Sequence, residues 1–371
     1  MNFLINASNL KAGGGLQVAD SICGQLNRFQ RHHFVVVLSL YLTTTKDRLQ
    51  GYENVDVLDY TIPNTFKTIV LGRDSFLDEL VESKHIDAVL TVFGPSRWRP
   101  SVPHLSGFAL PQLVIPESPY FTRMGFLERL KWKLWCSIRK WSLKRSADCF
   151  WTENPYISKR LNNKIHNVKV YTVSNYYNQV FDTPESWKKG ITLPNYDGIT
   201  CLSISSPTPH KNFGIIEGIV RYLREAHPGF KVRFVLTCDE EQWPMAGDVL
   251  EHVEYVGKTE VSEGPYLYEQ AGIMFMPTLL ECFTATYPEA MKMGVPIVTT
   301  DLEFARGLCG DAACCYSAVD AKAAAEAIYK VATDKTYAKQ LVENGKKQLL
   351  TYDNYEQRAD KLIGILEEIV K

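Results

Sequence analysis

The sequence predicts an α/β protein with two facing, doubly wound Rossmann-like domains. Short apolar, β-rich runs alternate with longer helical patterns, which is typical of parallel sheets covered by helices on both faces. The series pauses in a stretch rich in turn formers and charges, residues 175 to 198, and then starts again. A length of 371 residues with 45% hydrophobic content also fits two domains better than one.

The first domain is expected over residues 1–178. It opens with a strand in NFLINA, followed by a helix from about Leu16 to Arg28. Further strand-like runs are HFVVVLSL at 33–40, DAVLTVF at 87–93 and CFWTEN at 149–154. A linker is predicted over 179–198.

The second domain is expected over residues 199–350. Its six strand candidates, separated by helical segments, are ITCLSIS, KVRFVLTC, HVEYVG, IMFMPT, VPIVTT and AACCYS. The last segment, 351–371, places Ala359, Ile363, Ile365, Leu366 and Ile369 at helical spacing. We predict an amphipathic helix there that packs back towards the first domain.

Composition excludes several classes of function. The 41 basic and 42 acidic residues nearly cancel, so no overall field favours nucleic acid. The nine cysteines contain no CxxC pair and no zinc-like spacing, which argues against a disulfide framework or a structural metal. The start MNFLINASNL has no basic leader, and no apolar run approaches the roughly 18 residues that cross a bilayer. We therefore expect a cytoplasmic protein.

Three glycines, Gly13, Gly14 and Gly15, follow the first strand and precede a helix. Glycine allows a sharp turn there, and a helix N-terminus offers N–H groups to an anion. The dinucleotide fingerprint would need glycine where Val18 stands and an acid at the end of the second strand, so NAD is disfavoured. A tight turn without a ligand is the alternative.

A lysine, Lys211, follows the first strand of the second domain, directly before a helix. Ligands of open α/β sheets bind at the carboxyl ends of strands, so this cation is placed to meet a phosphate. Considered alone, it also fits a solvated surface position.

Two glutamates, Glu281 and Glu289, lie eight positions apart in an apolar stretch. Glu281 is expected in the turn after the strand IMFMPT, and Glu289 in a helix that ends at Gly294. Eight helical residues rise about 12 Å, comparable to the distance between sugar and ribose in a nucleotide sugar. Glu289 could accept ribose hydroxyls and Glu281 sugar hydroxyls. The alternative makes Glu289 a solvated helix residue and Glu281 a turn residue.

Together these residues resemble the retaining glycosyltransferases of family 4. The resemblance includes Gly13 to Gly15, Lys211 with Asn212, YEQAGIMFMPTLLE, the glutamate pair and EAMKMGVPIVTTD. It implies the GT-B fold of two facing Rossmann-like domains. It also implies metal-independent chemistry, without a cofactor, on a nucleoside-diphosphate sugar. The implied catalytic residues are Lys211 and Glu281. The implied donor-binding residues are Gly14, Gly15, Ser206, Lys211, Asn212, Gly257, Glu281, Cys282, Phe283, Thr284, Ala285 and Glu289.

The sequence departs from the family in three places. Ser206 stands where an arginine is usual, and Cys282 and Thr284 replace glycines, which could alter the sugar that fits. A histidine usual in the first domain is absent from PQLVIPESPYF, which offers Glu117 and Ser118 for the acceptor side. His104 aligns less well and is predicted to lie in a loop.

A basic helix is predicted from about residue 123 to 145, with eight basic residues and one acid, Glu128. We predict that one stripe packs on the domain, formed by Leu127, Leu130, Leu134, Ile138 and Trp141. Lys131, Trp132, Trp135 and Arg139 lie off that stripe and would suit an anionic membrane surface. A helix packed on two sides is the alternative, and nucleic acid a weaker one.

The sequence thus favours a cytoplasmic glycosyltransferase, peripheral on the inner face of the cytoplasmic membrane. Its expected partners are a nucleotide-sugar donor and a glycan or lipid-linked acceptor, as in bacterial surface-polysaccharide (O-antigen, capsule or LPS) synthesis. The alternatives are a non-catalytic GT-B partner subunit and a nucleotide-sugar epimerase of the same fold.

Overall fold

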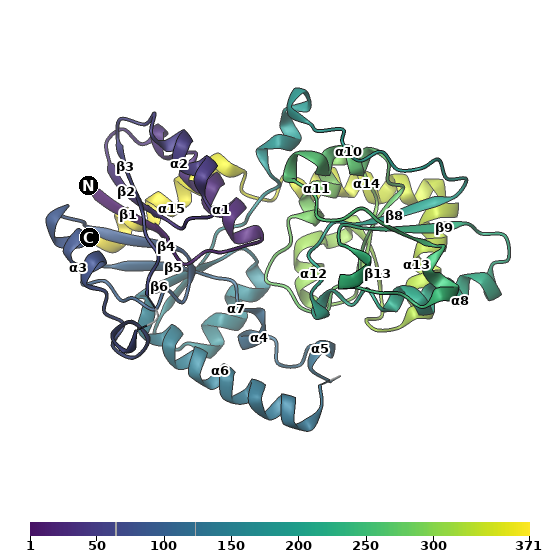
Figure 1. Cartoon of the computed structure of the whole chain (residues 1–371), viewed down its shortest axis with the longest axis horizontal. Coiled ribbons are helices and arrows are strands. Elements are labelled where there is room, and N and C mark those ends of the chain that lie inside the picture. Colours follow the sequence, from purple (N-terminus) through teal and green to yellow (C-terminus); the bar gives the residue numbers. More distant parts are fainter. Residues whose placement is uncertain (64, 123) are drawn as a thin grey trace. The chain divides into compact units, whose positions relative to one another are not determined.

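The computed structural model describes residues 1–63, 65–122 and 124–371 and divides into two compact units (Figure 1). Unit 1 comprises Met1–Pro116, Met124–Asn175 and Asp353–Lys371, and unit 2 comprises Glu117–Arg123 and Tyr176–Tyr352. The C-terminal segment therefore belongs to unit 1. The short segment that begins at Glu117 belongs to unit 2.

Unit 1 contains a parallel seven-stranded sheet in the order β3-β2-β1-β4-β5-β6-β7. The strands are β1 (Asn2–Ala7), β2 (His33–Leu38), β3 (Val55–Asp59), β4 (Ala88–Gly94), β5 (His104–Phe108), β6 (Cys149–Thr152) and β7 (Lys169–Thr172). The helices are α1 (Gly14–Cys23), α2 (Thr43–Leu49), α3 (Ser75–Ser83), α4 (Pro111–Val114), α6 (Phe126–Ser146), α7 (Pro155–Lys164) and α15 (Tyr355–Val370). Short η1 (Leu26–Arg28) and η2 (Lys67–Leu71) complete it.

Helices cover both faces of the sheet of unit 1. Because successive side chains of a strand point to opposite faces, each strand contributes to two cores. In β1, Phe3 and Ile5 join a core with α1 and α15, whereas Leu4 faces a second core with α3. The predicted helix from Leu16 to Arg28 is split: α1 ends at Cys23 and η1 follows. The predicted C-terminal helix is present as α15, with Ile363 and Leu366 in the core.

Unit 2 contains a parallel six-stranded sheet in the order β10-β9-β8-β11-β12-β13. The strands are β8 (Ile199–Ser203), β9 (Val232–Leu236), β10 (Val253–Tyr255), β11 (Ile273–Met276), β12 (Ile297–Thr300) and β13 (Ala313–Tyr316). All six strand predictions for this half are confirmed. The helices are α5 (Pro119–Thr122), α8 (Ile215–Ala226), α9 (Gly247–Leu250), α10 (Gly264–Glu269), α11 (Thr286–Met293), α12 (Glu303–Cys309), α13 (Ala321–Thr333) and α14 (Lys335–Leu349).

Six short 3₁₀ segments connect the elements of unit 2. They are η3 (Gln179–Asp182), η4 (Pro184–Ser186), η5 (Pro209–Lys211), η6 (Glu240–Gln242), η7 (Val261–Glu263) and η8 (Gly310–Ala312). The first two lie in the stretch predicted as a linker, which packs on unit 2: Phe181 is buried, and the backbone N–H of Leu193 donates to the Gln270 side chain over 2.8 Å. Both units are therefore Rossmann-like, as the sequence predicts.

Candidate active site

Lys211 lies at the carboxyl end of β8, in the short turn η5 before α8. Asn212 follows with φ of 56°, a left-handed conformation that asparagine adopts more readily than most residues. The chain turns there and starts α8 three residues later. The lysine is thereby held at the carboxyl-terminal side of the sheet and not on the solvated face of the helix.

Glu281 lies in the loop after β11, and this loop is fixed by backbone and side-chain bonds. The backbone N–H of Leu279 donates to the carbonyl oxygen of His210 over 2.8 Å. Thr300 donates from its hydroxyl to the carbonyl of Thr278 over 2.7 Å. The loop is thus tied both to the turn after β8 and to the end of β12.

The two loops meet because β8 and β11 are neighbours in the sheet. From this point β9 and β10 extend the sheet in one direction and β12 and β13 in the other, which makes it the topological switch point where open α/β sheets bind ligands. The ammonium of Lys211 lies 2.5 Å from Oε1 of Glu281, and both side chains are only 12% exposed. The structure therefore brings together the two residues predicted as catalytic.

Two further side chains surround Oε1 of Glu281. The hydroxyl of Thr278 donates to this oxygen over 2.8 Å, and Nε2 of His210 lies 3.7 Å from it. Burial lowers the pKa of His210, with the charge of Glu281 opposing that shift and Lys211 adding to it. Neither residue was predicted for the site, although His210 directly precedes Lys211 in the sequence. The result is a compact polar cluster of one cation, one carboxylate, an imidazole and a hydroxyl.

Glu289 lies in the first turn of α11 and is buried, with 7% of its surface exposed. The hydroxyl of Tyr268 donates to its Oε2 over 3.2 Å. Burial raises the pKa of Glu289 to about 7, and the Tyr268 hydrogen bond opposes this rise. The alternative of a solvated helix residue is therefore wrong. Helix α11 ends as predicted at Gly294, whose φ is 69°.

The turn between the two glutamates is packed inward. Cys282 and Thr284 are buried, and Phe283 places its ring edge-on to Tyr352 with 6.2 Å between centroids. The hydroxyls of Thr284 and Thr286 are hydrogen-bonded over 2.9 Å. Ala285 is the N-cap of α11. The departures from glycine at 282 and 284 therefore add side-chain volume inside the turn.

Two donor-site predictions of unit 2 remain, one in the same loop as Lys211 and one after β10. Ser206 is exposed in the loop between β8 and η5. Gly257, after β10, has φ of 69°, a conformation that favours glycine. An added Cβ there would lie 3.3 Å from the Asp239 carboxylate.

The residues predicted for the acceptor side, Glu117 and Ser118, belong to unit 2. Glu117 is exposed, whereas Ser118 is buried and donates from its hydroxyl to the carbonyl of Leu279 over 2.6 Å. Tyr120, in α5, places its ring edge-on to His210 with 6.2 Å between centroids. This segment thus supports the Glu281 loop from its own unit. Glu117 and Ser118 lie in the connection between α4, which ends at Val114, and α5, which begins at Pro119.

The glycine turn of unit 1 follows β1 as predicted. Gly13 has φ of 72° and caps α1, so a side chain there would be strained. A Cβ at Gly14 would meet nothing within 4 Å, and one at Gly15 would make ordinary contact with Leu10 and Phe93. The turn itself thus requires glycine at 13, and the glycine at 14 leaves open space beside the start of α1.

His104 is not a loop residue, so that prediction is wrong. It lies in β5 and is fully buried, with Nε2 2.8 Å from the Thr91 hydroxyl and Nδ1 2.5 Å from the Ser146 carbonyl. Burial lowers its pKa to about 4. The imidazole is a neutral structural group of the sheet core.

The basic helix is present as α6, but the prediction of its packed face is wrong. Leu127, Leu130, Leu134, Ile138 and Trp141 are all exposed, between 48% and 71%. Leu143, which lies off that stripe, is buried, and Trp132, Trp135 and Arg139 are half-buried beside it, while Lys131 is exposed. Arg123, the first of the eight basic residues, lies outside the described residues.

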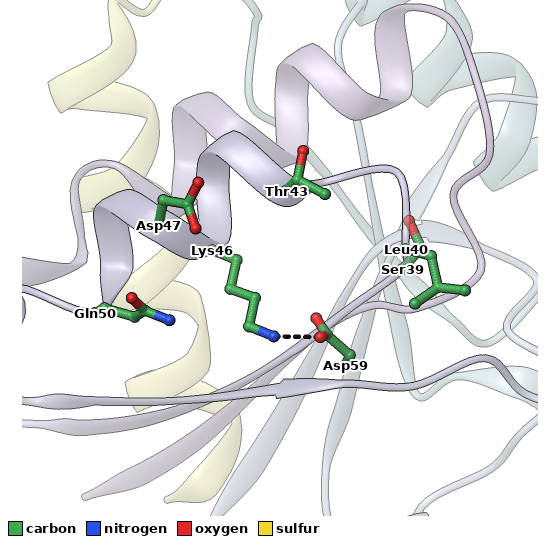
Figure 2. A pocket seen from close by; sticks show the side chains of 7 residues that line it. All are labelled: Ser39, Leu40, Thr43, Lys46, Asp47, Gln50 and Asp59. Carbon is green, nitrogen blue, oxygen red and sulfur yellow. Dashed lines mark hydrogen bonds and ion pairs between the residues drawn. The ribbon is translucent and has the colours of Figure 1, made fainter.

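A hollow of about 280 Å³ lies in unit 1, away from all the predicted site residues. Figure 2 shows it between α2 and the ends of β2 and β3. Its lining residues are Ser39, Leu40, Thr43, Lys46, Asp47, Gln50 and Asp59. Lys46 reaches across it to pair with Asp59 (Figure 2). The charge of Lys46 is therefore already neutralised by Asp59 and is not free to bind a ligand.

The described residues contain neither a cluster of metal ligands nor a helix suited to spanning a membrane. In these parts of the chain, no three His, Cys, Asp or Glu side chains gather closely enough to hold a metal ion. No helix among residues 1–63, 65–122 and 124–371 combines the length and apolar character needed to cross a membrane.

Part of unit 2 matches the model of a known family. Residues 242–348, which include both glutamates and exclude Lys211, match the family model described as Glycosyl transferases group 1. No curated protein matches the chain significantly. The family match supports a glycosyltransferase.

Solved structures match over nearly the whole chain. A glycosyltransferase from Rickettsia africae has a TM-score of 0.67 at 14% identity and covers 100% of this chain and 98% of its own. Sucrose-phosphate synthase from Thermosynechococcus elongatus has a TM-score of 0.66 at 15% identity, over 99% and 98%. HepE of Anabaena, in complex with UDP and glucose, has a TM-score of 0.65 at 13% identity, over 99% of both chains. The fold is therefore that of GT-B glycosyltransferases.

Proposed function

We propose that the protein is a retaining glycosyltransferase that moves a sugar from a nucleoside-diphosphate sugar to a glycan or lipid-linked acceptor. The observation that carries this proposal is the buried pair of Lys211 and Glu281 at the switch point of unit 2. A cation held there suits a diphosphate, and a carboxylate beside it suits sugar hydroxyls. The family match over 242–348 adds support from sequence.

The buried glutamate of α11 extends the donor site. Glu289 can accept the two hydroxyls of a ribose, since its Oε1 and Oε2 offer more acceptor positions than the single Tyr268 hydroxyl fills. The complex of HepE with UDP and glucose concerns a protein of the same fold, and supports a donor of this chemical class. We therefore assign ribose binding to Glu289 and diphosphate binding to Lys211.

The proposed reaction keeps the anomeric configuration. The acceptor hydroxyl attacks the anomeric carbon on the face from which the phosphate departs; a carbon–oxygen bond to the acceptor forms as the bond to the diphosphate breaks. The proton of the hydroxyl moves to the departing phosphate oxygen. Lys211 stabilises the charge that develops on the diphosphate, an electrostatic effect that is larger in a buried site. We propose that the transfer uses no metal ion.

The biological setting is proposed from the sequence resemblance. It is the synthesis of bacterial surface polysaccharide (O-antigen, capsule or lipopolysaccharide), at the inner face of the cytoplasmic membrane.

The test is incubation of the pure protein with UDP-, GDP- and ADP-sugars, with and without EDTA, followed by measurement of released nucleoside diphosphate. We expect slow hydrolysis of one donor class, unaffected by EDTA. Lys211→Ala should lower this rate by about 10²–10³-fold, the usual loss for a donor that stabilises developing charge. Lys346→Ala, which removes an exposed lysine paired with Glu343 on α14, is the matched control and should keep the full rate.

The products separate the proposal from its alternatives. Conversion of the donor into an isomeric sugar, without release of nucleoside diphosphate, would identify an epimerase. Donor binding without turnover in the presence of acceptor glycans would identify a non-catalytic subunit. Full activity of Lys211→Ala would remove the proposed catalytic role.

A further inference from the structure

Helix α6 presents an apolar face to solvent. Its six exposed large apolar side chains are Phe126, Leu127, Leu130, Leu134, Ile138 and Trp141. The described residues contain fifteen exposed large apolar side chains in all, so this one helix of 21 residues holds more than a third of them. Such a concentration is typical of a surface that meets another apolar phase.

The opposite face of the same helix is the one that holds it to unit 1. Leu143 is 1% exposed, Trp135 and Cys136 are half-buried, and the Cys136 thiol lies 3.8 Å from the Gln112 carbonyl of α4. At roughly 100° per residue, the six exposed side chains fall within a sector of about 120° opposite this packed face. Figure 1 shows α6 beside α4 at the periphery of unit 1.

Positive charges border the exposed face. Lys131 lies on one flank and Lys133 and Lys140 on the other, and all three are exposed. Near the C-terminal end, the guanidinium of Arg145 lies 4.4 Å from the ring centroid of Trp141. The helix holds seven basic residues and a single acid, Glu128. An apolar stripe between rows of cations matches the boundary of a membrane with anionic headgroups.

We propose that this face of α6 lies in the interface of an anionic lipid membrane, with its apolar stripe among the acyl chains and its lysines at the headgroups. A second copy of the chain is a poorer occupant, because a symmetric contact would set these cations against the same cations. Like every other helix of the described residues, α6 lacks the apolar length to cross a membrane, so we place it along the membrane surface. The lipid-facing ring is therefore Trp141, and the tryptophans of the packed face are turned away.

This membrane surface deepens the proposed function and rests on it in one respect: a glycosyltransferase with a lipid-linked acceptor would meet that acceptor at the membrane. The geometry of α6 is independent of the donor site. The two can therefore fail separately.

Co-sedimentation of the full chain with vesicles tests the surface. We expect binding to vesicles of equal parts phosphatidylglycerol and phosphatidylcholine, and little binding to phosphatidylcholine alone. The double variant Leu130→Glu with Leu134→Glu should weaken this binding at least tenfold. Leu350→Glu places the same charge on an 86% exposed leucine of unit 2 and should have no effect. Because all three leucines are exposed, none of these changes should prevent folding.

Fluorescence tests which face meets the lipid. Brominated phosphatidylglycerol vesicles should quench part of the tryptophan emission. Trp141→Phe should remove most of that quenching, whereas Trp135→Phe should leave it. The reverse result would overturn the orientation proposed here.

Other outcomes overturn the inference outright. These are no binding to anionic vesicles, equal binding of the double variant, or a dimer in light scattering that the double variant dissolves, which would assign the face to a second copy. Donor hydrolysis is measured on the same wild-type samples without vesicles. Hydrolysis without vesicle binding would refute only the membrane-binding role of α6. Vesicle binding without hydrolysis would refute only the proposed glycosyltransferase activity.

Discussion

Unit 1 and unit 2 each bury a glutamate whose pKa is raised to about 7, but the groups next to the two carboxylates differ. Burial is the main cause for both Glu153 and Glu289. Glu153 lies near Arg358 of α15, a buried guanidinium whose charge lowers the pKa of Glu153 again. For Glu289 the group that opposes the rise is the neutral hydroxyl of Tyr268.

The difference separates a carboxylate with a structural partner, Glu153, from the one that we propose to bind the donor, Glu289. Arg358 donates to Asn175 and to the hydroxyl of Ser21, so the charge near Glu153 belongs to a network that joins α15 to the rest of unit 1. Glu289 lies on α11, directly after the loop that carries Glu281. A buried carboxylate with a built-in cation holds the fold together. One that has only a neutral donor can still accept hydrogen bonds from a ligand.

Removing the cation of unit 1 should have the largest effect. Arg358→Met leaves Glu153 buried without its counter-charge, and we expect a loss of about 3–5 kcal/mol in the free energy of unfolding at pH 8. At pH 5 the loss should be smaller, because Glu153 is then largely protonated. Urea denaturation at both pH values measures this. Arg221→Met, at an exposed pair with Asp248, is the control. An equal loss at pH 5 and pH 8 would show that the charge of Arg358 does not stabilise ionised Glu153.

The buried carboxyl of unit 2 should make stability depend on pH in the opposite sense to a salt-bridged acid. Because the folded pKa of Glu289 is raised from 4.5 to about 7, its contribution to stability is complete below pH 4.5 and is lost as the pH rises through 7. Glu289→Gln removes this dependence. Relative to the wild type, the variant should gain on the order of 3 kcal/mol between pH 4 and pH 8.

Thermal and urea unfolding across this pH range provide the measurement for Glu289→Gln. Parallel curves for the wild type and the variant would show that folding does not shift the pKa of Glu289.

Donor affinity should separate the two glutamates. Glu289→Gln loses the charge that would accept ribose hydroxyls, so the affinity for the cognate nucleoside diphosphate should fall about tenfold to a hundredfold, as expected for hydrogen bonds of roughly 1.5–3 kcal/mol to a charged group. Glu153→Gln should leave the affinity unchanged. Titration calorimetry with UDP, GDP and ADP measures both. Equal losses in the two variants would show that the effect is a general one of buried charge.

The strand pattern was predictable from sequence because buried parallel strands are short, continuous apolar runs. All six strands of unit 2 are predicted. In unit 1 the sequence patterns predict four of the seven strands and miss β3, β5 and β7. Strand β5 contains His104 and Gly107 directly after Pro103, a composition that is typical of a loop. Its burial depends on the two neighbouring strands, β4 and β6, which local sequence does not reveal.

The site was predictable only in part. Sequence reasoning with the family resemblance selects Lys211 and Glu281, but their contact depends on β8 lying beside β11, an order that local patterns do not specify. No motif or spacing in the sequence marks Thr278 or Tyr268 as residues of the site. The packed face of α6 was predicted wrongly because both faces contain large apolar side chains, so periodicity finds two stripes without indicating which one meets unit 1.

The smallest predicted effect tests the neutral partner of Glu289. Tyr268→Phe removes the hydroxyl that donates to Oε2, so the stability should fall by about 1 kcal/mol and the pKa of Glu289 should rise further. If ionised Glu289 binds the ribose, affinity for the nucleoside diphosphate increases as the pH rises through this pKa, and the midpoint of that increase should shift upward in the variant. Tyr287→Phe, whose hydroxyl instead bonds Thr299, should leave the midpoint in place. A midpoint that is the same in all three proteins would mean that the Tyr268 hydroxyl does not tune the pKa of the group that governs binding. An affinity that does not change with pH in any of the three would mean that donor binding does not depend on the ionisation of Glu289, and the contrast with Glu153 would then lose its functional meaning.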